Sequence, residues 1–571
     1  MNNYQKIIEY FEEKMLEYGR QHPTQAAALL SGHRCPYTKH LIEAFCFIAS
    51  HIEDQINDDF NKLAQQLIEI IWPHYMYPLP SSVILEFKPK QGSIKSSQTI
   101  KKGTEVLSVM IPDDKGFPCK FTTSSSILVR PLNISKVEKI RNEDHDILQL
   151  VFSKNKHITW ENIGKQPLKI YLHGDQRIAL SLYYFILKKV KSVSVKWSKF
   201  TKDFTPDVFQ SVISNLDENF SLFSYPKYSF KGFQLLETYF NFPESLRYIK
   251  LDILSQLDIP DEISEFTVNL KMEYNNFSPG ISNFKLNCVP ATNLFDDDAS
   301  SDPIKFDNSK SVHEIKINQE YVNHRFPIFV RRVIGSNKNK RFEYHPFISY
   351  RHEQDDKSSG YYLLKRQYDK NGQPKILIQI ISSKNKKINE TISLNLSCSN
   401  GYLAKLLGPG DIKIIDSTGL DFVEVQNITA PTESVYPKIE NKELWTLINA
   451  LSLNYLSLNN VEYVKKLLLL YDRKKDIANQ KRIYGIDSVQ LYSKPVRKII
   501  KGCIVYGQLM DIILNNNNFT NNGDMLMFSE IFSKIISMYV SINSFCKIRV
   551  RKKNEKENFY ECQIKGERSI L

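Results

Sequence analysis

Apolar residues recur at three- and four-residue steps through the first 80 positions of the chain. The first stripe consists of Tyr4, Ile7, Ile8, Phe11, Met15 and Tyr18, with four glutamates on the opposite side. The same spacing returns in 41–52 and in 60–71, and prolines at positions 73, 78 and 80 then end it. Residues 1–80 are therefore predicted to form successive amphipathic helices that bundle together or pack against partner helices.

Between 81 and 435 the pattern changes to short apolar runs separated by Gly, Pro, Asn, Asp and Ser, which is typical of strands joined by turns. We expect two β-rich domains here, 81–255 and 256–435. Helical spacing interrupts them near Leu180–Leu187 and Pro206–Asn215. The charged stretch Asp296–Lys310 is expected to be an exposed loop.

Helical spacing returns after 435, at Glu443–Leu458, Val461–Leu470 and Ser529–Tyr539. Residues 436–571 are therefore predicted to form a C-terminal α/β region. The predicted fold class is α+β in a multidomain chain. It comprises an N-terminal helical segment, β-rich central domains and a mixed helical C-terminal region, which suits 571 residues at roughly 150 residues per domain.

The chain is basic, with a net charge of +13 and a pI of about 9.0. This balance would suit an acidic partner, a nucleic acid or an anionic membrane face. However, the lysines are spread along the whole chain rather than gathered in one module. The densest basic group is Arg549, Arg551, Lys552 and Lys553, for which a solvated face and an acidic partner surface both stay open.

The compartment is predicted from features that the sequence lacks. The N-terminus has no basic start, apolar run and cleavage site of a signal peptide. No apolar stretch reaches the ~18 residues of a membrane span. The eight cysteines are scattered without a CxxC pair, which favours reduced thiols. A cytoplasmic protein is therefore expected.

The search for catalytic patterns finds no P-loop, dinucleotide-binding glycine motif, HExxH or GxSxG. His33, His40 and His51 are too widely spaced for a typical metal site. Asp296–Asp298 lacks the ligand spacing of an EF-hand, which favours a solvated turn. We therefore predict no catalytic, cofactor-binding or metal-ligating residues. Two alternatives stay open, a β-rich carbohydrate-active enzyme whose carboxylates converge in space and a basic nucleic-acid-binding protein.

A series of motifs follows the order of one known family along almost the whole chain. The N-terminal ones are LIEAFCFIASHIEDQINDDF (Leu41–Phe60) and LIEIIWPHYMYPLPS (Leu67–Ser81). Later ones are IYLHGD (Ile170–Asp175), GFQLLETYFNFPESLRYIKL (Gly232–Leu251) and SCSNGYLAKLL (Ser397–Leu407). Together they resemble TssF (also ImpG or VasA), a baseplate subunit of type VI secretion systems that is similar to wedge proteins of contractile phage tails.

The resemblance implies a structural wedge component rather than an enzyme, without a cofactor. Family members assemble as two copies with one TssG and associate with TssK and TssE around the hub that carries the VgrG spike. The contractile sheath grows on that platform. The implied partners are therefore a second copy of this chain, a TssG-like subunit, TssK, TssE and VgrG, with no nucleic acid and no direct membrane insertion. The implied location is the cytoplasm, docked near the inner membrane through the baseplate and membrane complex.

Seven residues of the N-terminal region are predicted to contact partners: Tyr4, Phe11, Phe45, Phe60, Trp72, His74 and Tyr75. The first four lie on amphipathic helices whose apolar sides a mixed bundle with the TssG-like subunit would cover. The alternative is that these side chains pack into this chain's own core. Two copies in one wedge also predict flexible joints, which we place near Pro78–Pro80 and Pro431–Pro437.

Overall fold

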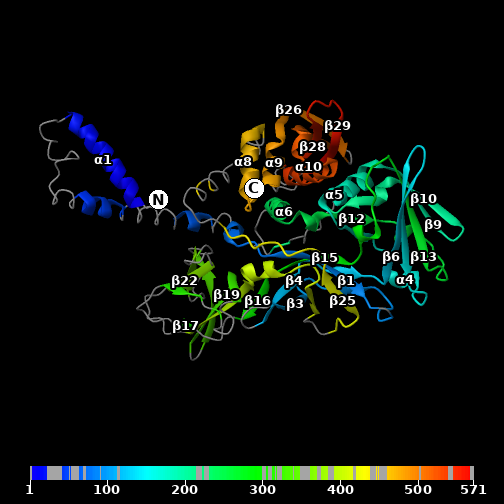
Figure 1. The fold of residues 1–571 in the computed structure, drawn as a ribbon, viewed down its shortest axis with the longest axis horizontal. Helices are drawn as coiled ribbons and strands as arrows, with labels where there is room; N and C mark the ends of the chain where they lie inside the picture. Colours follow the sequence, from blue (N-terminus) through cyan, green and yellow to red (C-terminus); the bar gives the residue numbers. More distant parts are fainter. Residues whose placement is uncertain are drawn as a thin grey trace. The chain divides into compact units, whose positions relative to one another are not determined.

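The computed structural model describes residues 3–21, 42–50, 52, 63–68, 73–90, 92–111, 116–213, 222–223, 231–298, 304–305, 312–315, 317, 324–337, 340–347, 360–368, 374–382, 391–415, 419–437, 445, 448, 459–500, 503–537, 540 and 544–565. The chain divides into two compact units (Figure 1). We call Met1–Met76 with Lys438–Leu451 the helical unit, and Tyr77–Pro437 with Ser452–Leu571 the β-rich unit.

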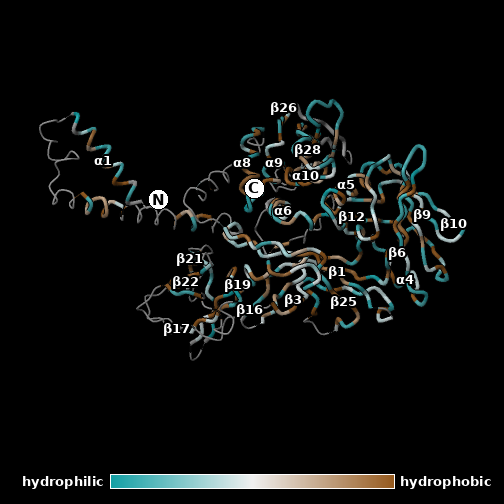
Figure 2. The backbone as a smooth tube through the Cα atoms, viewed as in Figure 1, coloured by the Kyte–Doolittle hydropathy of each residue, from teal (hydrophilic) through white to brown (hydrophobic). Residues whose placement is uncertain are grey.

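The described part of the helical unit consists of α1 (Asn3–Gln21), helical residues 42–50 and 63–68, and the short 3-10 helix η1 (Pro73–Met76). Figure 2 shows hydrophobic and hydrophilic residues alternating along α1. Its inward side includes Met15, and the later helices bury Cys46, Ala64 and Ile68. The helical spacing of the N-terminal sequence is therefore confirmed where the structure describes it.

A six-stranded antiparallel sheet forms the first layer of the β-rich unit, in the order β24–β3–β4–β15–β1–β25. Its strands are β1 (Ser82–Pro89), β3 (Glu105–Ile111), β4 (Phe117–Thr123), β15 (Cys288–Thr292), β24 (Ile412–Ile415) and β25 (Val423–Asn427). Three stretches that lie far apart in the sequence therefore share one sheet. The pair β2 (Gln98–Ile100) and β5 (Ile127–Val129) adds a small ribbon.

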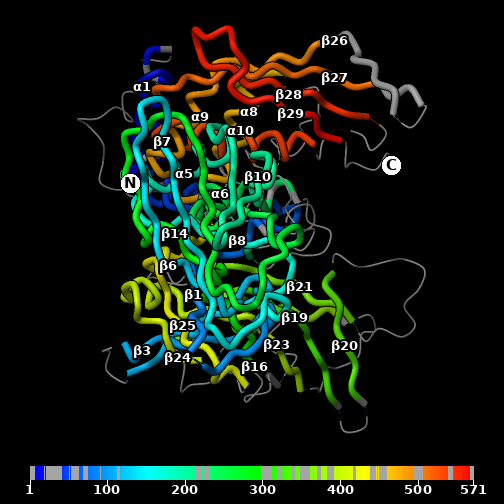
Figure 3. Tube along the Cα trace, turned by 90° about the vertical axis from the view of Figure 1, so that its right-hand side faces the viewer, coloured from blue at the N-terminus to red at the C-terminus, as the bar shows by residue number. Residues whose placement is uncertain are grey.

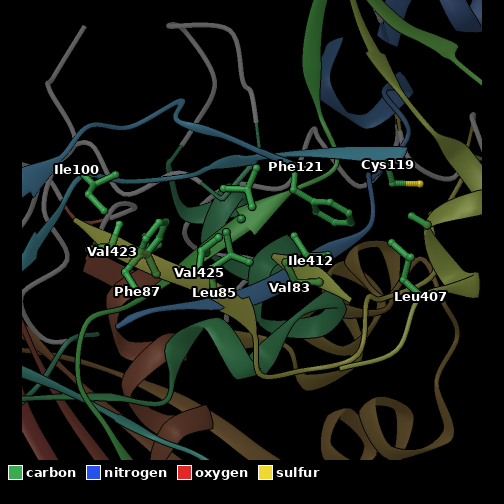
Figure 4. Close-up of a cluster of buried hydrophobic side chains, with 14 of the residues drawn as sticks. Val83, Leu85, Phe87, Ile100, Cys119, Phe121, Leu407, Ile412, Val423 and Val425 are labelled. Carbon is green, nitrogen blue, oxygen red and sulfur yellow. The ribbon is translucent and has the colours of Figure 1, made fainter. Parts of the chain in front are cut away.

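The side chains of β1 are buried on both faces of this sheet, from Ser82 to Phe87. One face contributes Val83, Leu85 and Phe87 to an apolar core that also contains Phe121 (Figure 4). The other face directs Ile84 into a second core. A strand covered on both faces tends to be apolar at successive positions, as Val83, Ile84 and Leu85 are here.

A five-stranded antiparallel sheet follows in the order β10–β9–β13–β7–β6. Its strands are β6 (Leu132–Arg141), β7 (Asp146–Lys154), β9 (Val190–Trp197), β10 (Phe200–Phe204) and β13 (Glu265–Met272). Burial alternates at every residue of β7, as the period of a half-buried strand requires. Phe152 of β7 stacks on Phe266 of β13 at 5.1 Å between ring centroids, and these rings fill the buried side.

A four-stranded sheet and most helices of the central region come from residues 160–285. The sheet has the order β11 (Phe209–Ser211), β12 (Tyr248–Leu251), β8 (Leu168–Leu172), β14 (Phe284–Lys285). The helices are α4 (Trp160–Ile163), α5 (Gln176–Tyr184), the π-helix η2 (Phe185–Lys189), α6 (Lys231–Asn241) and the 3-10 helices η3 (Pro206–Val208), η4 (Pro243–Leu246), η5 (Leu254–Gln256) and η6 (Ile281–Asn283).

An eight-stranded sheet covers the second half of the central region, in the order β16–β23–β19–β20–β21–β22–β18, with β17 also paired to β23. Its strands are β16 (Phe295–Asp298), β17 (Ile304–Lys305), β18 (Val312–Glu314), β19 (Phe326–Asn337), β20 (Lys340–Pro346), β21 (Gly360–Tyr368), β22 (Pro374–Ser382) and β23 (Thr391–Ser399). The 3-10 helix η9 (Gly401–Leu406) then leads back to the six-stranded sheet.

The C-terminal region is a helix-and-sheet layer, as Figure 3 shows for its side-by-side strands. It contains α8 (Val461–Tyr471), α9 (Ile477–Tyr484), α10 (Asn522–Ser537), η11 (Asn516–Asn518), and the strands β26 (Ile486–Ile500), β27 (Cys503–Leu514), β28 (Phe545–Lys552) and β29 (Asn558–Lys565). β27 and β28 are parallel, so α10 is their crossover helix. It is buried nearly all round because β28 and β29 contact it as well as α5 and α6.

The predicted α+β, multidomain fold class is confirmed, as are the helices near Leu180–Leu187 and Val461–Leu470. The helix expected at Pro206–Asn215 is wrong, because Phe209–Ser211 pairs with Ile249–Leu251 as a strand. Most of Glu443–Leu458 lies outside the described residues, as do His33, His40 and His51. The four-part domain division stays a prediction.

The solvated turn expected at Asp296–Asp298 is also wrong, because these residues form β16 and pair with β23. Two arginines form ion pairs with the carboxylates of this strand. Arg325 Nη1 lies 2.7 Å from Asp297 Oδ2, and Arg331 Nη2 lies 2.7 Å from Asp296 Oδ1. Neutralised carboxylates can remain in a strand that they would otherwise destabilise.

Candidate assembly surface

The described helices of the helical unit expose large apolar side chains. Phe45 and Phe47 keep 57% and 64% of their surface accessible. We call the following residues the exposed apolar set: Tyr10, Leu16, Tyr18, Phe45, Phe47, Ile48, Ile52 and Leu63. Single exposed apolar residues are common, but so many on three helical segments make this set a candidate interface.

Phe45, a member of the exposed apolar set, also contacts the neighbouring helix. Its ring contacts Phe11 of α1 with 5.5 Å between the centroids. Cys46, the next residue, is fully buried. Burial raises the pKa of the Cys46 thiol, and the nearby Glu12 carboxylate of α1 adds to the shift. The two helical segments therefore pack through the rings of Phe11 and Phe45, and Phe45 keeps its remaining surface exposed.

The structure brings two of the seven predicted interface residues together, namely Phe11 and Phe45. Tyr75, in η1, is only 8% exposed in the chain by itself. Tyr4 lies in α1 and His74 in η1, but their side chains are outside the described residues, as are Phe60 and Trp72 entirely. The interface role of all seven stays a prediction.

Several members of the exposed apolar set were missed by the sequence reasoning. Tyr10 and Leu16 lie on α1 beside glutamates, away from the stripe that the helical spacing selects. Phe47 likewise lies off the 41–52 stripe. The sequence signal that could have found them is a large apolar residue on the charged side of an amphipathic helix. That side is normally polar when it faces water.

The two predicted joints lie side by side in the β-rich unit. Leu79 and Val435 form an antiparallel bridge, with N–H to carbonyl distances of 2.8 and 2.9 Å. The Thr432 N–H also donates to the Ser82 carbonyl at 3.1 Å. The first segment begins where the chain leaves the helical unit, after Met76, and the second ends where the chain returns to it, before Lys438. Flexibility at this double connection stays a prediction.

Side chains from separate layers hold both ends of this connection. Arg473 Nη1 donates to the Tyr77 carbonyl at 2.7 Å, and the Tyr77 ring stacks on Phe329 at 5.3 Å. The Arg366 guanidinium lies 4.9 Å from the same ring centroid. On the second segment, the Tyr368 hydroxyl donates to the Pro437 carbonyl. Tyr77 and Pro437, the ends of the connection that belong to the β-rich unit, therefore contact the eight-stranded sheet and the C-terminal region.

A buried carboxyl lies where α10 meets the four-stranded sheet. The Tyr183 hydroxyl of α5 donates to Glu530 Oε2, and Ser211 Oγ of β11 donates to the same oxygen at 3.0 Å. Burial raises the pKa of the Glu530 carboxyl, and the two hydrogen bonds and Lys188 offset only part of the shift. The three residues connect α10 to two elements of the central region.

Replacing Glu530 by glutamine is expected to remove part of the pH dependence of stability. In the wild type the folded pKa lies above the unfolded one. The contribution is complete below the ordinary carboxyl range and is lost as pH rises through the raised pKa. The Glu530→Gln variant should therefore lack this fall and be more stable at neutral pH. Thermal unfolding over a pH series measures it, with the exposed Glu557→Gln as control. A wild-type pH slope in Glu530→Gln would contradict the assignment.

The densest basic group of the sequence is largely neutralised by ion pairs within the C-terminal sheet. Arg551 Nη2 lies 2.9 Å from Asp511 Oδ2, and Lys553 Nζ lies 2.8 Å from Asp487 Oδ1. Arg549 lies 4.0 Å from Glu561. These pairs reduce the field that would attract a nucleic acid.

The described residues contain no group of three or more His, Cys, Asp or Glu side chains arranged to hold a metal ion. No helix in the described ranges is long and apolar enough to cross a membrane.

A family model described as "Type VI secretion system, TssF" matches residues 1–568 of the 571. The chain belongs to the TssF family. The predicted family, a baseplate component of type VI secretion systems, is thereby confirmed. Among curated relatives, the type VI secretion system component TssF1 of Pseudomonas aeruginosa is 24% identical, over 96% of each chain.

Two solved structures share the fold of this TssF-family chain. One is a chain of the TssK–TssF–TssG baseplate subcomplex determined by cryo-electron microscopy. It is 22% identical with a TM-score of 0.79, over 92% of this chain and 98% of that one. The other comes from the baseplate complex of a type VI secretion system. It is 19% identical with a TM-score of 0.62, over 100% and 99% of the two chains.

Proposed function

We propose that this chain is a non-enzymatic wedge subunit of a type VI secretion baseplate. Two copies assemble with one TssG-like subunit and associate with TssK and TssE around the VgrG spike hub, forming the platform on which the contractile sheath grows. The complex works in the cytoplasm, docked near the inner membrane. The subunit has four domains, at residues 1–80, 81–255, 256–435 and 436–571. The paired connection at Leu79 and Val435 is its flexible joint.

The observation that carries this proposal is the exposed apolar set on the helical unit of a TssF-family chain. A partner helix that covers Phe45 and Phe47 would stabilise the complex by about 25 cal/mol per Å² of buried apolar surface. The solved relatives, which come from a TssK–TssF–TssG subcomplex and a larger baseplate complex, support the same role.

Co-purification of this chain with its genomic neighbours, followed by native mass spectrometry, tests the proposal. The expected species holds two copies of this chain and one TssG-like subunit. A stable monomer that ignores those neighbours would contradict the wedge role. Recovery of a complex with another stoichiometry would refute the two-to-one ratio while leaving the baseplate assignment in place.

Replacing Phe45 by aspartate is expected to weaken binding of the TssG-like subunit by tenfold or more. A carboxylate would have to leave water at the centre of an apolar contact, which costs on the order of 2 kcal/mol or more. Phe200→Asp is the matched control, because Phe200 is similarly exposed but lies on β10 of the β-rich unit. Equal retention of the partner by both variants, measured as the yield of complex, would place the interface elsewhere.

A further inference from the structure

A cleft of about 550 Å³ opens within the β-rich unit where four separate segments meet. Its walls are the end of β8 with the start of α5, the end of α6 with η4, residues 428–432 after β25, and the segment from Lys474 into α9. We call it the Lys474 cleft. Its volume falls in the range of about 300–1,000 Å³ that is typical of ligand sites.

The floor of the Lys474 cleft is polar and deeply buried. Arg247 is 4% exposed and pairs through Nη2 with Glu244 Oε1 at 3.1 Å, whereas its Nε has no hydrogen-bond partner in the described chain. Asn241 is 5% exposed and donates through Nδ2 to the Glu237 carbonyl at 2.7 Å. Its Oδ1 has no partner among the described residues. The floor therefore keeps one unused donor and one unused acceptor.

The rim of the cleft holds a cation with no described carboxylate in direct contact. Lys474 is exposed, and its Nζ donates to the backbone carbonyl of Asn241 at 2.9 Å. No carboxylate of the described residues lies within 4 Å of this Nζ. Burial lowers the pKa of Lys474, and the more distant carboxylates of Glu244, Asp476, Glu433 and Asp472 offset part of that shift. The neighbouring charges are already used, because Arg482 pairs with Asp524 at 3.0 Å and the Asp476 carboxylate caps α9.

We propose that the Lys474 cleft binds an extended acidic segment of a partner protein. Lys474 pairs with a carboxylate of that segment, which supplies a counter-ion in direct contact. The floor favours a peptide over a simple carboxylate, because Asn241 Oδ1 needs a hydrogen-bond donor and Arg247 Nε needs an acceptor. A peptide backbone offers both groups in repeating pairs, whereas acetate offers acceptors alone at neutral pH, and phosphate is tested separately because it keeps a P–OH donor. The floor side chains must turn toward the cleft to make these bonds, since both atoms are covered in the present arrangement.

This proposal takes its partner from the proposed baseplate role, but its first test needs the full chain alone. Fluorescence anisotropy with a labelled hexaglutamate peptide, at physiological salt, measures binding, and a labelled hexaglutamine peptide reports the contribution of the backbone. Lys474→Met should weaken hexaglutamate binding about tenfold, the usual weight of one charge-assisted hydrogen bond. Lys474→Arg should retain most of it. Lys156→Met removes the same charge from an exposed position outside the cleft and should change the affinity less than twofold.

Three results would overturn the proposal. Hexaglutamate could fail to bind, or Lys156→Met could weaken it as much as Lys474→Met does, which would show attraction to net charge alone. Inorganic phosphate could displace the peptide at equal concentration, which would assign the cleft to small oxyanions.

In the co-purified complex, carbodiimide should cross-link Lys474 to a carboxylate of another subunit. Failure of the complex to form would count against the baseplate role, and the peptide measurement would still decide the cleft.

Discussion

Replacing Arg473 by alanine is expected to lower the free energy of unfolding of the β-rich unit by about 3–5 kcal/mol. Arg473 forms a buried ion pair with Glu237, and their side chains are 3% and 0% exposed. Removing the guanidinium leaves the Glu237 carboxylate in the interior without its cation. The Tyr77 carbonyl loses its donor at the same time. Urea denaturation followed by circular dichroism measures the loss, and hydrogen exchange in α6 and α8 should locate it.

An exposed ion pair provides the matched control for Arg473→Ala. Lys405 lies 3.1 Å from Glu433, and both side chains are about 60% exposed. Water solvates each charge whether or not the other is present, so Lys405→Ala should change stability by less than about 1 kcal/mol. A similar small change in Arg473→Ala would mean that water reaches Glu237 and that the pair is not a structural anchor.

Replacing Phe121 by alanine is expected to cost about 3–5 kcal/mol, because it opens a cavity at the centre of the six-stranded sheet. Phe121 is fully buried and faces the β1 and β25 side chains across the core (Figure 4). The surrounding strands are paired on both sides, so they can collapse only partly into the space. Thermal unfolding of the purified chain should show the loss as a lower midpoint.

Met110→Ala is the control for this core substitution. Met110 belongs to β3, the strand next to Phe121, but it is 65% exposed. Its truncation opens no cavity and should stay within about 0.5 kcal/mol of the wild type. Equal destabilisation by both variants would show that the sheet responds to any change of side chain rather than to core packing.

Arg473 also contacts one of the two chain segments that connect the β-rich unit to the helical unit. Arg473 holds Tyr77 from the C-terminal region, and Tyr368 holds Pro437 from the eight-stranded sheet. Tyr77 is the first residue of the β-rich unit after the chain leaves the helical unit, and Pro437 is the last one before the chain returns to it. Arg473→Ala therefore tests both the stability of the interior and the joint that the wedge proposal requires.

The spacing of hydrophobic residues predicted helix or strand correctly where an element buries one face and exposes the other. The short apolar runs between 81 and 435 indicated strands, and the structure places one of them, within Asp146–Lys154, in the five-stranded sheet. The same reasoning failed at Pro206–Asn215, where the proline begins a 3-10 turn and the following residues pair with β12. Short segments carry too little periodicity to outweigh a neighbouring strand that needs a partner.

The sequence alone determined the family, the α+β class and the helical N-terminal region, because motif order and hydrophobic period are written in neighbouring residues. Only the tertiary structure decided that β15 joins β1 and β4, more than 160 residues away, and that Glu237 pairs with Arg473. It also decided which apolar residues of the helical unit stay exposed, as Phe45 and Phe47 do. Periodicity reports which side of an element is apolar, whereas burial depends on what lies against that side, and that surface comes from distant parts of the chain.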